Sequence, residues 1–509
     1  MFARRHLLLV PYALCLSAAA YLLIITPTLN LDDLQIAEWG PQALSEGWGK
    51  ALTTLLFNLD FGVWQPRTYG LARAIHYIQA WLFGAAPAPV YALILAAHFG
   101  SGVLVYKIIR KIGSDRLTAI FAAMTWIASP AVLPLLKVQH HFLYLIATYY
   151  PLFAWLLLSA DRRQTPWVFL LGTILLTMAW MLGEGVAIPM FAAVATAALL
   201  AGSWQRGLSL FAQGAIAGLL FVLYLGYQVV FLRSSDATQR FKLAPDLGRI
   251  DIFLHQLGQN VRAVLGLSHY DAELGMAIGG IGVLRNPGLW VLALVLTGFG
   301  IAAMRHWPQT DFPANRRLAA TFALLSFSSI GICLAFVLAG MGVFSVRYAA
   351  AFFALMPVAV IALLDAYATK AVARPAAAAI AALSVALLLS LLYRAEVLVN
   401  APNRIRLQAL QGSVVLLRPQ DQFDPAKYGA IPGLTSINAN GLANPMRSLW
   451  TADPALRYYA GAVIGNRCRM VSADRAEVFL LETSKGIYPL KNFVVEGSSL
   501  TASQACNAK

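Results

Sequence analysis

Long apolar runs alternate with short polar segments along most of this chain. A membrane-spanning helix needs roughly 17 to 25 predominantly apolar residues. The pattern predicts eleven such segments, at 7–27, 88–108, 117–136, 141–160, 166–182, 186–203, 207–232, 287–304, 318–340, 346–366 and 375–395. The first is interpreted as a retained helix and not a cleaved signal peptide, because its apolar character continues through Ile25. The sequence therefore predicts an all-α polytopic membrane protein.

Two stretches between these segments mix apolar and charged residues. Trp, Leu and Phe are interspersed with Glu, Lys and Arg over 34–83, and a later loop repeats the mixture over 250–267. This pattern is typical of amphipathic helices that lie in the membrane interface. We expect extracytoplasmic helices at 34–83 and 250–267 that cover the outer end of a transmembrane domain.

The composition changes after about residue 397. Asn, Pro, Ser and Arg become more frequent, and apolar runs of strand length occur at 414–417, 478–481 and 493–495. The chain is therefore divided into a transmembrane domain at 1–397 and a small C-terminal α/β domain at 398–509. Cys468 and Cys506 lie in this second domain, and the sequence leaves open whether they form a disulfide.

Composition and charge narrow the class of protein. Of 509 residues, 59% are hydrophobic and 12% are charged, which is more apolar than a soluble core can use. The net charge of +15 does not indicate nucleic acid, because the cations fall in alternate short loops, the pattern of a cytoplasmic membrane face. These cations are Arg4, Arg5, Lys107, Arg110, Lys111, Arg116, Arg162, Arg163, Arg206, Arg305, Arg316, Arg317, Lys370 and Arg374. Eleven crossings then place the N-terminus in the cytoplasm and the C-terminal domain outside it.

This topology sorts the remaining polar residues by side. A set of acids, cations and aromatic residues from distant parts of the chain maps to the outer ends of the predicted spans: Asp32, Asp33, Glu38, Arg67, Lys137, His140, His141, Glu184, Arg347 and Tyr348. We expect them to meet in one extracytoplasmic cavity. Acids and cations together suit a phosphorylated substrate.

Five short motifs in this set occur in a recognisable order. They are Leu31-Asp32-Asp33, Trp64-Gln65-Pro66-Arg67-Thr68, the run from Gly84 to Tyr91, the run from Met181 to Pro189, and Arg347-Tyr348. Through them the chain resembles the integral-membrane glycosyltransferases of the GT-C fold, particularly the protein O-mannosyltransferases and lipid A aminoarabinose transferases. The resemblance implies an enzyme that transfers a sugar from a polyprenyl-phosphate-linked donor to an extracytoplasmic glycan, lipid or protein. Membrane lipids would be its other partners.

The acidic pair is the candidate for catalysis. Sugar transfer needs a base that takes the proton of the acceptor hydroxyl, and we assign this role to Asp32 or Asp33. Adjacent carboxylates repel each other when both are ionised, which makes one of them a better base. The structural alternative is a helix N-cap with a solvated neighbour, for a helix that begins near Leu34.

The other residues are candidates for substrate binding. Arg67 and Arg347 offer guanidinium groups for the donor phosphate, although Arg347 also suits an interfacial anchor. Substrate contacts are also assigned to Tyr348, Lys137, His140, His141 and Glu184, the last of which equally suits a tight turn. Side chains of consecutive histidines diverge and no spaced third ligand follows them, so no metal site is predicted. No cofactor is assigned, and a divalent cation stays open.

Two other classes of protein compete with the enzyme. A non-catalytic flippase or transporter of lipid-linked saccharides would also collect charges in a lipid-accessible cavity, but such proteins often show internal repeats and polar residues at mid-membrane. A surface-polysaccharide ligase or polymerase would also transfer sugars from a lipid-linked donor. The sequence carries no Walker loop, which disfavours an ATP-driven pump.

Overall fold

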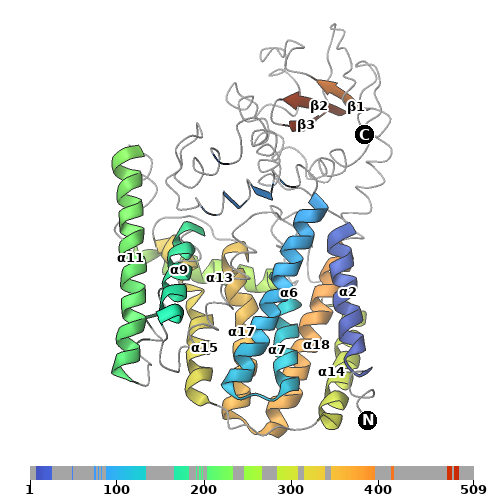
Figure 1. Cartoon of the computed structure of the whole chain (residues 1–509). Helices are drawn as coiled ribbons and strands as arrows, with labels where there is room; N and C mark the ends of the chain where they lie inside the picture. The colour runs from blue at the N-terminus through green and yellow to red at the C-terminus, as the bar shows by residue number, and fades with distance from the viewer. Residues whose placement is uncertain are drawn as a thin grey trace.

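The computed structural model describes a helical bundle and a small sheet (Figure 1). The described residues are 7–25, 87–132, 166–182, 203–232, 246–265, 284–307, 315–338, 346–395, 414–417, 478–483 and 486–491, with single helical positions between 49 and 82 and between 191 and 198. All statements about structure below refer to these residues. The predicted spans at 141–160 and 186–203 lie outside them, apart from those single positions.

Helices make up most of the described chain. They are α2 (Val10–Ile25), α6 (Pro87–Ile112), α7 (Arg116–Ile127), α9 (Pro166–Leu182), α11 (Trp204–Leu232), the 3-10 helix η2 (Leu247–Arg249), α13 (Ile250–Val264), α14 (Pro287–His306), α15 (Arg316–Ser328), α16 (Gly331–Leu338), α17 (Val346–Tyr367) and α18 (Lys370–Ala395). Among these, five contain apolar stretches long enough to cross a membrane: α6, α11, α14, α17 and α18. The expectation of a mainly helical membrane protein is confirmed at this level.

Helices α17 and α18 form the centre of the bundle. The apolar windows of α17 and α18 are 67% and 61% buried, against 17% for α11 at the periphery. Helix α18 packs against α2, α7, α14 and α17, and its alanines allow the close approach that small residues give in membranes. One close approach is at Gly300 of α14, where an added Cβ would lie 2.8 Å from the Cβ of Ala378.

Two short helices, α7 and α15, begin at the same end of this bundle, and each has a side chain that caps its N-terminus. Asp115 caps α7 by accepting hydrogen bonds from the amides of Leu117 and Thr118, and Asn315 caps α15 by accepting from Leu318. The turn before α7 passes through Gly113, whose φ of 106° favours glycine. The amide of Asn315 donates to the carbonyl of Ile112 over 2.6 Å, which joins the two starts. We call this end of the bundle the Asp115 end.

Both capped helices stop inside the bundle, unlike the continuous spans expected at 117–136 and 318–340. Helix α7 has 12 residues and α15 has 13, lengths of about 18 and 20 Å against a hydrocarbon core of about 30 Å. After α7 the chain forms a buried turn over 128–132. After α15, Ser329 and Ile330 interrupt the helix before α16, and the hydroxyl of Ser329 donates to the carbonyl of Ser326.

The opposite end of the bundle is where α2 ends and α6 and α17 begin, and we call it the Arg347 end. Helix α13 lies across the bundle near this end and packs against α16 and α17 (Figure 1). The backbone there is tied by a hydrogen bond from the Asp246 amide to the carbonyl of Leu338. The helix falls within the stretch 250–267 that the sequence marked as amphipathic.

The C-terminal region contains three described strands, β1 (Val414–Leu417), β2 (Val478–Thr483) and β3 (Gly486–Lys491). They form one sheet in the order β1-β2-β3, with β1 parallel to β2 and β2 antiparallel to β3. In the register, Val414 pairs with Val478, and Val478 with Lys491. Two of the three expected strand segments, at 414–417 and 478–481, coincide with β1 and β2, while 493–495 lies outside the described residues.

Candidate functional site

Most of the residues predicted to form the site lie outside the described residues. Arg347 and Tyr348 are in the first turn of α17, where the structure describes the backbone but not these side chains. The predicted site residues not covered by the structure are Asp32, Asp33, Arg67, Lys137, His140, His141 and Glu184. Their convergence therefore stays a prediction.

Polar contacts at the Asp115 end join three pairs of elements. Besides capping α7, Asp115 accepts a hydrogen bond from the hydroxyl of Thr118 and forms an ion pair with Arg374 of α18, whose Nε lies 3.1 Å from Oδ2. The side chains of Arg374 and Asp115 are only 13% and 9% exposed. Every oxygen of this carboxylate is engaged, which suits a structural clamp between α7 and α18 and not a proton acceptor.

A second ion pair lies at the turn between α17 and α18. Lys370 Nζ is 3.0 Å from Oδ1 of Asp365, whose side chain is fully buried. The Nε of Arg316 donates to the carbonyl of Ala366, and its guanidinium lies 5.4 Å from the ring centroid of Tyr367. These contacts attach the start of α15 to the end of α17. The Asp115 end is therefore held by groups that pair with one another.

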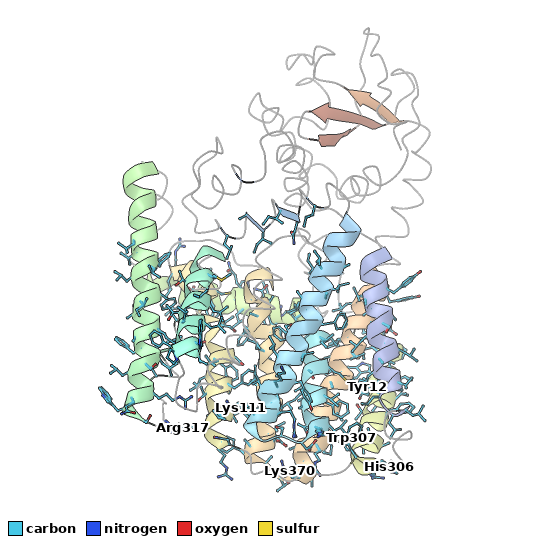
Figure 2. All side chains as sticks on the ribbon, in the orientation of Figure 1. Tyr12, Lys111, His306, Trp307, Arg317 and Lys370 are labelled. Carbon is cyan, nitrogen blue, oxygen red and sulfur yellow. The ribbon has the colours of Figure 1, made fainter. Side chains whose placement is uncertain are left out.

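Cations dominate the surface of the same end. Figure 2 shows Lys111, His306, Arg317 and Lys370 together at this end of the bundle. Arg116, Arg305, Arg316 and Arg317 are all exposed. These positive charges therefore gather at one end of the bundle, as the short basic loops of the sequence predicted.

A polar network that the sequence did not predict lies inside the bundle, between α6 and the end of α7. It contains His98, Ser101 and Trp126, which are 1%, 0% and 0% exposed. Trp126 Nε1 donates to Ser101 Oγ over 2.6 Å, and His98 Nε2 lies 3.0 Å from the carbonyl of Ile127. The signal that was available is a histidine with a serine one turn later, in the apolar part of α6 that precedes its basic last turns.

Helix α13 shows a second unpredicted feature near the Arg347 end. Phe253, Gln256, Asn260 and Val264 are its buried residues, so two amides lie on the face that packs against the bundle. The opposite face exposes apolar side chains, including Leu254 at 58%. The i, i+4 spacing of the two amides between Phe253 and Val264 is the sequence signal for this polar inner face.

Metal-binding groups are absent from the described part of the chain. No three His, Cys, Asp or Glu side chains gather there in a way that could hold a metal ion. His140 and His141 are outside that part. Cys15 and Cys333 are free cysteines within α2 and α16, and Cys333 is fully buried.

Known proteins were compared with the chain by sequence and by structure. No family profile matches the sequence, and no curated protein matches it. Among solved structures, the chain is similar to ArnT from Cupriavidus metallidurans in the apo state. The match covers 80% of this chain and 82% of that one, with a TM-score of 0.34 and 13% sequence identity.

Proposed function

We propose that this protein is a membrane glycosyltransferase that moves a sugar from a polyprenyl-phosphate-linked donor to an extracytoplasmic glycan, lipid or protein. The motifs from Leu31-Asp32-Asp33 to Arg347-Tyr348 support the donor and the reaction through their resemblance to GT-C enzymes. The protein would be embedded in the bacterial inner membrane. Its Asp115 end would face the cytoplasm and its C-terminal domain the periplasm.

One structural observation carries the proposal: the described helix ends divide the polar residues into two sets. The cations of Arg116, Arg316 and Lys370 begin helices at the Asp115 end. Helix α17, which opens with Arg347 and Tyr348, begins at the opposite end, and α2, from which the chain continues to Asp32, ends there (Figure 1). This arrangement supports one shared outer site, away from the cationic cytoplasmic face.

The roles of the residues follow from the chemistry of the transfer. Asp32 or Asp33 would take the proton of the acceptor hydroxyl while the anomeric carbon develops positive charge. Arg67 and Arg347 would bind the donor phosphate, since a guanidinium offers a fork of donors to phosphate oxygens. Lys137, His140, His141, Glu184 and Tyr348 would orient the sugars. In the outer leaflet the donor lipid would reach this site laterally.

The test is a transfer assay on the full-length protein in lipid nanodiscs. Purified protein is incubated with polyprenyl-phosphate sugars and candidate acceptors, and the glycosylated product is measured for wild type, Asp32→Asn and Asp33→Asn. We expect one of the two variants to lose roughly 100-fold or more in rate, the usual contribution of a general base. Asp251→Asn, a change to an exposed carboxylate in the first turn of α13, serves as the matched control and should stay within about twofold.

Two results would overturn the proposal. Transfer that survives both aspartate substitutions removes Asp32 and Asp33 from the mechanism. A wild-type protein that transfers no sugar, but lets lipid-linked saccharide cross vesicle membranes, is a flippase and not an enzyme.

A further inference from the structure

The polar network between α6 and α7 bonds the last residues of α7 to the neighbouring helix. His98 Nε2 lies 3.0 Å from the carbonyl of Ile127, and Ser101 Oγ donates to the carbonyl of His98 over 2.6 Å. The indole of Trp126 donates to the same serine hydroxyl. Helices α6 and α7 approach closely here, since a Cβ added at Gly102 would lie 2.6 Å from Ile127 Cδ1.

Ile127 is the point at which α7 stops within the bundle. The residues that follow are Ala128, Ser129, Pro130, Ala131 and Val132, which are all buried although they are not helical. Non-helical backbone at membrane depth must find hydrogen-bond partners within the protein, because lipid offers none. Ala128 and Ser129 donate back to Met124 and Trp126, respectively. The carbonyl of Ile127 obtains its donor from His98.

The contact with the carbonyl of Ile127 determines which ring nitrogen of His98 carries the proton. Because a carbonyl can only accept, Nε2 of His98 must carry the proton. The other ring nitrogen, Nδ1, is buried and has no hydrogen-bond partner within the described part of the chain. A leucine would avoid the unpaired ring nitrogen, but it would leave the carbonyl of Ile127 without a hydrogen-bond donor, so the bond from Nε2 is the reason for a histidine at this position.

We propose that His98 is a positioning residue that holds the interrupted end of α7. By fixing Ile127 and the turn over 128–132, it sets the point at which the following segment begins. That segment carries Lys137, His140 and His141, the candidate substrate contacts. The inference rests on the proposed function for its effect on transfer, but its effect on the turn is independent of that function.

The test compares side chains that keep or lose the donor at Nε2. In His98→Gln the amide nitrogen takes the place of Nε2, whereas in His98→Asn the side chain is too short to reach Ile127. Backbone hydrogen exchange of residues 126–132 is measured on the full-length protein in nanodiscs. We expect exchange roughly tenfold faster in His98→Asn and His98→Leu, and within about threefold of wild type in His98→Gln.

Transfer kinetics are measured on the same preparations. We expect kcat to fall roughly tenfold in His98→Asn, with donor KM within about threefold and with recovery in His98→Gln, because the groups are misplaced and not removed. Gln213→Leu is the matched control. It removes another bond between helices, from Nε2 of the buried Gln213 to the carbonyl of Phe169 over 3.1 Å, and should change neither readout.

The outcomes separate this inference from the proposed function. One outcome is that the wild type transfers no sugar while hydrogen exchange at 126–132 is still faster in His98→Asn than in His98→Gln. In that case the proposed function is wrong and the positioning role of His98 stands. Equal exchange in His98→Gln and His98→Asn would overturn the role of His98, as would unchanged exchange in both. Because these two variants keep a polar side chain of similar size, the test holds even where His98→Leu does not fold.

Discussion

The Asp115 end and the Arg347 end of the bundle use polar side chains in different ways. At the Asp115 end, Asp115 pairs with Arg374, which joins α7 to α18. Asp365 pairs with Lys370, which joins α17 to α18. Near the Arg347 end, α13 turns Gln256 and Asn260 inward and exposes Leu254 outward. In the first arrangement, the buried acidic groups form ion pairs that hold helices together. The second places two amides on the helix face that packs against the bundle.

This difference predicts that substitutions at the two ends have separable effects. The largest should come from Arg374→Ala, which leaves the buried carboxylate of Asp115 without its cation. Breaking a buried ion pair from one side typically costs about 3–5 kcal/mol. We expect the free energy of unfolding, measured by SDS titration in mixed micelles, to fall by about that amount. Arg317→Ala, at an exposed arginine of the same end, should change it by less than about 0.5 kcal/mol.

The comparison would break down if both arginine variants had the same stability. It would also fail if Arg374→Ala abolished sugar transfer in protein that remained fully folded. Either outcome would move chemistry to the Asp115 end.

At the other end, Arg347→Gln should affect transfer and not stability. Removing a guanidinium that binds phosphate costs about 2.7 kcal/mol of transition-state stabilisation, so kcat/KM should fall roughly 100-fold. The free energy of unfolding should stay within about 0.5 kcal/mol of wild type. A variant that loses stability but transfers sugar normally would identify Arg347 as an interfacial anchor.

The sequence predicted the helices better than it predicted their interruptions. The span expected at 287–304 agrees closely with α14, because apolar length and the Asn286-Pro287 start are local signals. The stops after Ile127 and Ser328 were missed, because the spans were delimited by hydropathy, which does not register Pro130 just after the end of α7. Pro130 has no amide N–H with which to continue α7, and the carbonyl of Ile127 is bonded instead by His98, 29 positions earlier in the chain. Hydropathy does not register such a contact.

For the candidate site, the sequence could predict only which side of the membrane each polar residue lies on. The cations at Arg116, Arg316 and Lys370 do lie at one end of the bundle, as their positions in alternate loops indicated. Distances between Asp32, Arg67 and Arg347 depend on the packing of segments far apart in sequence, which periodicity does not encode. The amides of α13 were missed because the stretch was assessed for its apolar face alone.

Close packing between α14 and α18 allows a sharper test of whether this contact contributes to the free energy of unfolding. In Gly300→Ala the new Cβ would lie 2.8 Å from Ala378 Cβ and 3.0 Å from Tyr12 Oη. Overpacking of this kind costs about 1–3 kcal/mol. The matched change is Gly298→Ala, where nothing lies within 4 Å, and alanine should stabilise the helix slightly. Equal stabilities in the SDS titration would contradict the close approach.

The smallest effect should come from Tyr12→Phe in α2. The hydroxyl of Tyr12 donates to the carbonyl of Leu296 over 2.6 Å in a fully buried position. Losing this bond should lower the free energy of unfolding by about 1 kcal/mol, with transfer unchanged. Tyr21→Phe, on the same helix but 63% exposed, should have no measurable effect. A similar loss in both variants would show that α2 is not anchored through Tyr12.

The central position of α18 has a consequence for how the protein is made. Its neighbours α2, α7 and α14 are synthesised earlier, and each packs against a helix that leaves the ribosome only near residue 395. At ribosomal rates of about 5–20 residues per second, α2 waits on the order of tens of seconds for its permanent partner. During that interval the early helices depend on the insertion machinery or on lipid. Chains truncated before Lys370 should therefore be cleared by membrane proteases instead of accumulating as partial bundles.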